Sequence, residues 1–156
     1  MAKPYNNHSP FSTLHHISIV VRDINAAVKF YESIGIGPFE SYPPIKEYVK
    51  IDVPDKEGFY SLTIKCARIG PVELQLIQPG KGKSLYKDFL EKKGEGVYHL
   101  GFGVEDIEGS EADVRAMGLG VISSGRRENG SGFSYLDTAD KAGVTLLIRQ
   151  SPPSTG

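Results

Sequence analysis

The stretch YHLGFGVEDI, residues 98–107, repeats the pattern of HHISIVVRDI, residues 15–24. Each copy has a histidine in second place and ends in Asp-Ile, and matching residues lie 83 positions apart, as His16 and His99 do. The match continues to the glycine pairs GIG at 35–37 and GLG at 118–120. A repeat of this length predicts two homologous halves of roughly 70 residues each within one compact domain.

The composition excludes several classes of partner. A chain of 156 residues suits one domain with one core, and a net charge of -1 gives no global field for nucleic acid or an anionic membrane. No apolar run approaches the ~20 residues that span a bilayer, and the start of the chain lacks the apolar core of a signal peptide. We therefore expect no nucleic-acid or membrane partner and a cytoplasmic location. The single cysteine, Cys66, lies in a strand-like run, which favours a packed apolar residue over a nucleophile.

Both halves share one order of elements. Each begins with an alternating strand, passes the Asp-Ile corner, continues as about ten residues of helix and stops at Gly35 or Gly118. Three strand-like runs follow in each half, so the pattern predicts an α+β fold of two βαβββ modules. The expected boundaries are an N-terminal tail at 1–12, the first module at 13–80, a linker with a short helix at 81–95, the second module at 96–151 and a C-terminal tail at 152–156.

Alternation along the first strand of each half indicates which way the histidines point. Ile17, Ile19 and Val21 form an apolar stripe that should pack on the helix, so His16 and Ser18 lie on the opposite face. His99 is placed in the same way in the second half. Ser18 and Gly101 are small and leave space beside the imidazoles. A concave polar surface is expected there, and a structural histidine pair is the alternative.

The repeated module, with VELQLIQP at 72–79, SLYKDFLEKKGEGVYHLGFGVEDI at 84–107 and DKAGVTLLIRQ at 140–150, resembles the vicinal oxygen chelate superfamily. This superfamily includes glyoxalases, extradiol dioxygenases, antibiotic-resistance proteins and methylmalonyl-CoA epimerases, and the epimerase group is the nearest likeness. The resemblance, over about residues 12–151, implies a cup-shaped mixed sheet that holds one divalent metal. The ligands that it implies are His16, Gln75 and His99, and the fourth ligand, usually glutamate, falls on Leu147.

Leucine cannot bind a metal, so the implied site consists of two imidazoles and an amide, without a carboxylate to offset the charge. We therefore expect weakened metal affinity, and a pocket without a metal is the alternative. The sequence does not distinguish among Co, Mn, Ni, Zn, Fe and Mg as the metal. Glu73 lies two residues before Gln75 and so on the same strand face. The backbones of the two residues are ~7 Å apart along the strand. A role in supporting the ligands or in proton transfer is expected for Glu73 sooner than ligation, and a solvated strand residue is the alternative.

The resemblance implies an isomerase or lyase that acts next to a carbonyl through an enolate-type intermediate, with a CoA thioester as one candidate small-molecule substrate. The base falls loosely on Glu57 in PDKEGFY, for which a turn with solvated charges is the alternative. Because Leu147 replaces the opposite carboxylate, a one-base reaction survives more easily than a two-base racemisation.

The candidate substrate-binding residues are Ser18, Arg126 and Arg127, since a forked guanidinium suits a substrate carboxylate. A hairpin with solvated arginines is the alternative for the last two. Superfamily members commonly build their cups across a subunit contact, so a homodimer is compatible with the resemblance. The competing function is a metal-free protein that binds or sequesters a small molecule, as drug-binding relatives do.

Overall fold

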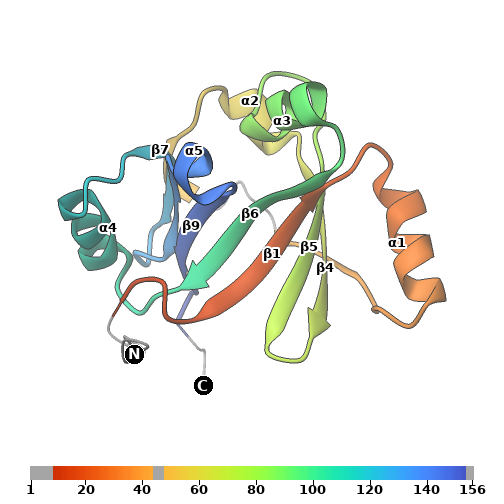
Figure 1. Cartoon of the computed structure of the whole chain (residues 1–156), viewed down its shortest axis with the longest axis horizontal. Coiled ribbons are helices and arrows are strands. Elements are labelled where there is room, and N and C mark those ends of the chain that lie inside the picture. Colours follow the sequence, from red (N-terminus) through yellow and green to blue (C-terminus); the bar gives the residue numbers. More distant parts are fainter. Residues whose placement is uncertain (1–8, 44–47, 154–156) are drawn as a thin grey trace.

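A computed structural model describes residues 9–43 and 48–153, so most of both predicted tails lies outside the described residues. In this described part of the chain, nine strands form one curled sheet in the order β2-β4-β5-β1-β6-β9-β8-β7-β3, with helices packed around it (Figure 1). The strands are β1 (Leu14–Val20), β2 (Glu40–Ser41), β3 (Tyr48–Asp52), β4 (Thr63–Ile69), β5 (Val72–Gln78), β6 (Gly96–Gly103), β7 (Val121–Arg127), β8 (Gly132–Leu136) and β9 (Thr145–Gln150). The helices are α1 (Ile24–Ser33), α2 (Lys56–Tyr60), α3 (Leu85–Lys93), α4 (Ile107–Ala116) and α5 (Ala139–Ala142).

The repeat is visible in how each half holds its helix. Asp23 and Asp106 cap α1 and α4 by accepting hydrogen bonds from backbone N–H groups in the first turn. Gln78, the last residue of β5, accepts a hydrogen bond from the N–H of Ile24 at 2.8 Å. Gln150, the last residue of β9, does the same for Ile107 at 2.9 Å. The two glutamines are therefore equivalent, which makes Leu147 the counterpart of Gln75, three residues earlier in each strand.

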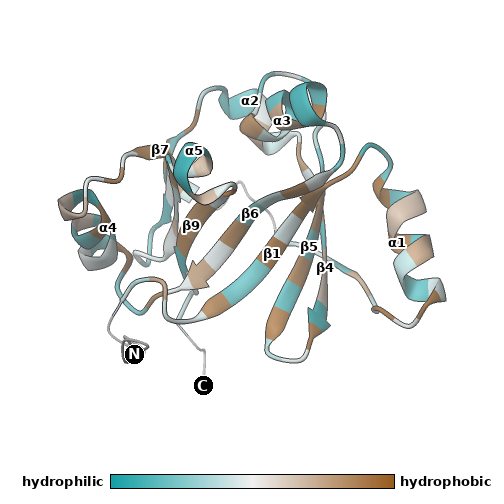
Figure 2. Ribbon diagram, viewed as in Figure 1, coloured by the Kyte–Doolittle hydropathy of each residue, from teal (hydrophilic) through white to brown (hydrophobic). Residues whose placement is uncertain are grey.

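The two halves join through their first strands. β1 and β6 run antiparallel at the centre of the sheet, and each has the last strand of its own half, β5 or β9, parallel on its other side. In Figure 1 the helices α1 and α4 lie at opposite ends of the molecule, each beside its own half. Figure 2 shows alternating apolar and polar bands along β1 and β5, the period expected of strands with two different faces.

The strand β3 departs from the expected pairing. It belongs to the first half in sequence, and we expected it to pair with strands of that half. Instead it runs antiparallel beside β7 and forms the far edge of the second half, with Tyr48 opposite Arg127. The chain therefore crosses from β2 at one edge of the sheet to β3 at the other. The crossing places Tyr48 in the core, where its ring packs on those of Phe59 and Phe133.

Most of the predicted apolar face of each helix is packed. Ile24 is buried with Ala27, Val28 and Tyr31 against it, and Ile107 and Val114 are buried in α4. Two apolar residues that follow the last turn of each helix are exposed instead: Ile34 is 59% exposed and Met117 is 56% exposed. Phe11, assigned to the N-terminal tail, packs edge to face on Phe102.

The predicted strands and the linker helix agree with the structure to within a few residues, and Ser84 caps α3. The short elements α2, α5 and β2 were not predicted. None of the helices in the described ranges combines the length and the apolar character needed to cross a bilayer.

Candidate functional site

Sheet register brings the three expected ligand residues together. Ser18 on β1 lies opposite Gln75 on β5 and opposite His99 on β6, so these three residues form one row across adjacent strands. Residues in one row of a sheet point to the same face. His16, two residues before Ser18, shares that face. All four side chains are buried, which makes the histidine face the interior of the cup.

The imidazoles of His16 and His99 face each other. Their Nε2 atoms are 2.9 Å apart, and the two side chains are only 3% and 1% exposed. The approach is possible because Gly101 lies beneath the His16 ring, where a Cβ would fall within 3.0 Å of three ring atoms. The expected space beside this imidazole is therefore real, and glycine provides it.

A line of polar contacts continues from this pair toward the rim of the cup. The Nδ1 atoms of His15 and His16 are 2.8 Å apart, and Nη1 of Arg149 lies 2.8 Å from Nε2 of His15. Burial lowers the pKa of His99 to about 3. Burial, with the neighbouring His99 and His15, lowers the pKa of His16 well below its usual value. Both rings are thus neutral at neutral pH.

Two buried polar atoms of the site have no hydrogen-bond partner among the described residues: Oγ of Ser18 and Nδ1 of His99. An unsatisfied buried polar group costs about 1–3 kcal/mol. A ligand or a water usually completes the bonding of such groups, so the two atoms make this part of the cup a candidate binding site.

The histidines line a narrow cavity of about 50 Å³ whose other walls are largely aromatic. Phe59 stacks on Phe133, and the Phe133 ring packs edge to face on Tyr48 and Tyr135. The Tyr135 hydroxyl is hydrogen-bonded to that of Tyr86 deep in the core. Burial raises the pKa of both tyrosines well above the usual value. Both hydroxyls are therefore neutral. The rings of Tyr86 and Tyr135 each contact the ring of His99.

A second pocket, of about 490 Å³, opens beside the cavity and shares Tyr42, Arg127 and Arg149 with it. Arg68 and the carboxylates of Glu40 and Glu73 also line this pocket. Arg149 was not predicted as a site residue. The sequence could have indicated it, because Arg149 lies two residues after Leu147 and so on the same face of β9.

Glu73 lies beside the expected ligands. Its Oε1 accepts a hydrogen bond of 3.0 Å from Nε2 of Gln75, and its backbone pairs with His16 in the sheet. The bond orients the Gln75 amide, which is the supporting role expected for this carboxylate. Leu147 is 3% exposed and lines the cavity, so an apolar side chain occupies the position of the fourth ligand.

The other candidates are divided between the cup and the outside. Arg127 lines both pockets, is 9% exposed, and its guanidinium lies 4.4 Å from the centre of the Tyr48 ring. Glu57 is exposed on α2 and is absent from the described lining of the cavity. Its assignment as a base therefore stays a prediction without a structural contact to support it.

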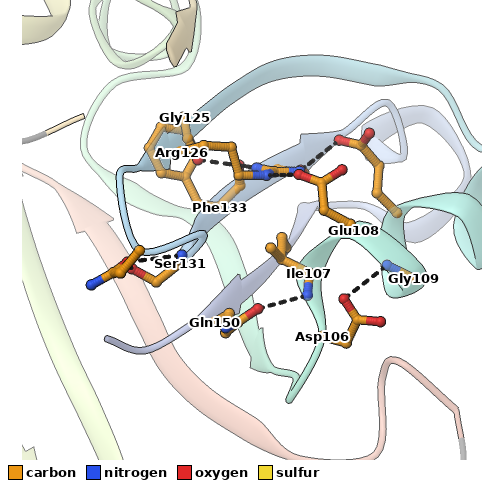
Figure 3. A network of polar contacts seen from close by, with 12 residues as sticks. Asp106, Ile107, Glu108, Gly109, Gly125, Arg126, Ser131, Phe133 and Gln150 are labelled. Atoms are coloured by element: carbon orange, nitrogen blue, oxygen red, sulfur yellow. Dashed lines mark hydrogen bonds and ion pairs between the residues drawn. The ribbon is translucent and has the colours of Figure 1, made fainter. Parts of the chain in front are cut away.

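Arg126 points away from the cup, toward α4 (Figure 3). Its Nε lies 2.7 Å from Glu108 and its Nη2 lies 3.1 Å from Glu111, and it also donates to Phe133 O and to Ser134. Adjacent residues of a strand face opposite sides, so only one of the two arginines could face the cup. Arg126 ties β7 to α4.

Replacing Arg126 by methionine is expected to lower the free energy of unfolding by about 2–4 kcal/mol, because Glu111 and Ser134 lose a charged partner in a partly buried setting. Arg115→Met is the matched control, since that side chain is 56% exposed and its ion pair with Glu111 is longer, at 3.6 Å. The control should lose less than about 1 kcal/mol. Urea unfolding measures both, and equal losses would contradict the assignment.

The donor atoms present fit a divalent metal in part. The Nε2 atoms of His16 and His99 lie 2.9 Å apart, so both could contact one ion. The Gln75 amide supplies an oxygen. The described residues hold no group of three or more histidine, cysteine, aspartate or glutamate side chains suited to a metal. A site of two imidazoles and one amide is therefore what the chain offers.

The model of the glyoxalase/bleomycin resistance protein/dioxygenase superfamily matches residues 15–136. The chain belongs to this superfamily. The expected resemblance is confirmed, and so is the superfamily's α+β fold. An ethylmalonyl-CoA/methylmalonyl-CoA epimerase of Cereibacter sphaeroides is 26% identical over 88% of this chain and 96% of its own. The uncharacterised protein YqjC of Bacillus subtilis is 35% identical, over 57% of this chain and 55% of its own.

Solved structures of the superfamily agree with the fold. A methylmalonyl-CoA epimerase from Mycobacterium tuberculosis superposes with a TM-score of 0.70 at 21% identity, covering 95% of this chain and 93% of its own. A Streptomyces coelicolor methylmalonyl-CoA epimerase variant, in complex with 2-nitronate-propionyl-CoA, superposes with a TM-score of 0.69 at 27% identity over 90% and 98% of the two chains. Epimerases are thus near relatives of this chain within the superfamily.

Proposed function

We propose that this chain is an epimerase-type isomerase that moves a proton at the carbon next to the thioester carbonyl of a CoA substrate. The observation that carries the proposal is the buried His16–His99 pair, in one row with Gln75, inside a cup shared with CoA epimerases. The names of those relatives favour the isomerase over a lyase. The homodimer and the cytoplasmic location stay predictions.

His16, Gln75 and His99 would hold the divalent ion. When bound, the ion would supply Lewis-acid stabilisation of negative charge on the carbonyl oxygen. The neutral state of both imidazoles supports this, because a divalent metal binds a neutral imidazole and no net proton need be lost. The proton that lies between the two Nε2 atoms would have to move to an Nδ1 atom. The aromatic walls around the histidines exclude water, which strengthens every charge interaction at the reacting carbon.

Glu73 is proposed as the base, because its carboxylate lies against Gln75 and faces the pocket that opens into the cavity. On the other side, where Leu147 provides no carboxylate, Tyr135 is a protonated group on the neighbouring strand: its backbone pairs with Leu147 and its ring contacts His99. Because its pKa is raised, Tyr135 stays protonated at neutral pH, so it can offer a proton but has no deprotonated form available to accept one. The two faces of the substrate carbon therefore meet unequal groups.

This inequality gives the test. In D₂O, the protein should exchange the α-hydrogen of one epimer of methylmalonyl-CoA much faster than that of the other, as followed by proton NMR. Glu73→Gln and His16→Gln should each lower the exchange rate at least ~100-fold, the usual range for loss of a positioned acid or base. Glu57→Gln tests the competing base, and Glu91→Gln, an exposed position on α3, is the matched control.

Bound metal is measured on the same preparations by elemental analysis after incubation with divalent ions and desalting. About one equivalent in the wild type and none in a His16→Ala, His99→Ala double variant is the expected result. Exchange lost in Glu57→Gln but kept in Glu73→Gln would move the base to α2. No exchange of either epimer, in wild-type protein that retains metal, would refute the isomerase.

One observation favours a second function. Leu147 and the stacked rings of Phe59 and Phe133 make the cavity more apolar than a metal site requires. A metal-free protein that sequesters an apolar compound would use this wall directly. In that case wild type and the double histidine variant would bind an apolar dye with equal affinity, and neither would retain metal.

A further inference from the structure

We propose that the pocket lined by Arg68, Arg127 and Arg149 is a subsite for an anionic oxygen group of the ligand, either a carboxylate or a phosphate. This inference rests on the proposed function for the nature of the substrate, although the subsite itself can be tested without turnover. The pocket holds about 490 Å³, within the usual range of small-molecule sites.

The three guanidinium groups come from different strands. Arg68 lies near the end of β4, Arg127 ends β7, and Arg149 lies near the end of β9, so both halves of the fold contribute. Within residues 9–43 and 48–153, no carboxylate lies within ion-pair distance of Arg68 or Arg149. Arginine presents a planar fork that matches carboxylate and phosphate oxygens. Two cations at the pocket are thus available to an incoming anion.

The balance of charge in the pocket also favours an anion. Three arginines face two carboxylates, those of Glu40 and Glu73. Cys66, also on the wall, adds no negative charge, because burial and the nearby Glu73 raise the pKa of its thiol. A cationic or purely apolar ligand would not supply an anionic oxygen to Arg68 or Arg149.

The position of the pocket fits a ligand that extends into the cavity. Tyr42, Arg127 and Arg149 line both spaces, so one molecule can occupy both. Arg149 contacts His15, whose ring contacts His16. An anion held by Arg149 therefore lies close to the histidines that would hold the ion. This anion can be the carboxylate of the substrate or a phosphate of its CoA carrier.

Two probes distinguish these sources: malonate carries only carboxylates, and adenosine 3′,5′-bisphosphate carries only phosphates. Binding of each is measured by titration calorimetry to wild type and to Arg68→Gln, Arg149→Gln and Arg115→Gln. We expect at least one probe to bind, with an affinity that falls about 10-fold in each of the first two variants. Arg115, on the exposed side of α4, is the matched control and should leave the affinity unchanged.

If the affinity for malonate falls in the Arg68 and Arg149 variants, the subsite binds the carboxylate of the substrate. If the affinity for the bisphosphate falls, the subsite binds a phosphate of the carrier. His16→Gln separates this proposal from the proposed function, because it should abolish exchange and metal binding while the arginine-dependent affinity remains. If neither probe binds, or if binding is indifferent to Arg68 and Arg149, the anion subsite is refuted even where exchange activity is present.

Discussion

Gly101→Ala is expected to disable the site through a single methyl group. The added Cβ would lie within 3.0 Å of three atoms of the His16 ring, closer than real Cβ atoms approach, and one of these atoms is the Nε2 that contacts His99. His16 must therefore move or rotate. Overpacking of this kind costs about 1–3 kcal/mol of stability. A shift of ~1 Å in a positioned group costs about 100-fold in rate, so α-hydrogen exchange should fall by at least this factor.

Gly103→Ala is the matched control, two residues further along β6 on the same face. A Cβ at that position meets only the Cβ of His15, at 3.8 Å, which is an ordinary contact. Exchange kinetics and thermal unfolding of both variants are compared with wild type. If both variants were equally active, the His16 ring would not depend on the gap at Gly101, and the geometry of the pair would be wrong.

Acidification is expected to destabilise the protein strongly below pH 6.5. His99 has a pKa of about 3 in the folded chain against an ordinary value of 6.5, so the unfolded chain takes up a proton first as the pH falls. Stability is therefore complete above pH 6.5 and declines toward pH 3. Each pH unit within this window costs about 1.4 kcal/mol for one such group, or about 3 kcal/mol at pH 4.5. His16 adds a loss of the same sign.

The measurement is the free energy of unfolding in urea at several pH values from 7.5 to 4.5. His99→Gln should show a slope shallower by close to one proton, whatever its stability at neutral pH, because the slope counts protons taken up on unfolding. His16→Gln should likewise show a shallower slope of the unfolding free energy against pH. An unchanged slope in both variants would show that these rings titrate normally in the folded protein.

The repeat explains why much of the site could be predicted from sequence. The resemblance placed the fourth ligand at Leu147, and the structure agrees, because Gln78 and Gln150 end equivalent strands and each bonds a helix N-terminus. Strand alternation then placed His16, Ser18 and His99 on one face. Local period and register were enough, since these residues lie in long strands.

Other features depend on information that a local pattern does not contain. The helix α2 has five residues, too few for a helical period, so Glu57 could be assigned only by loose analogy. Arg126 and Arg127 were both expected to bind substrate, although adjacent strand residues face opposite sides. The sequence does not say which of them faces inward, since β7 carries few apolar residues to mark its core face. The pocket arginines come from three separate strands, and only the curl of the sheet brings them together.

The crossing of β3 has a consequence for how the chain is made. Its partner strand β7 is encoded more than seventy residues later, with Tyr48 opposite Arg127, so β3 cannot pair until most of the second half has left the ribosome. Pairings this distant in sequence are slow to form. In the first half, β3 therefore stays unpaired until β7 has been made. A chain interrupted near residue 95 would leave both fragments with an unpaired strand edge.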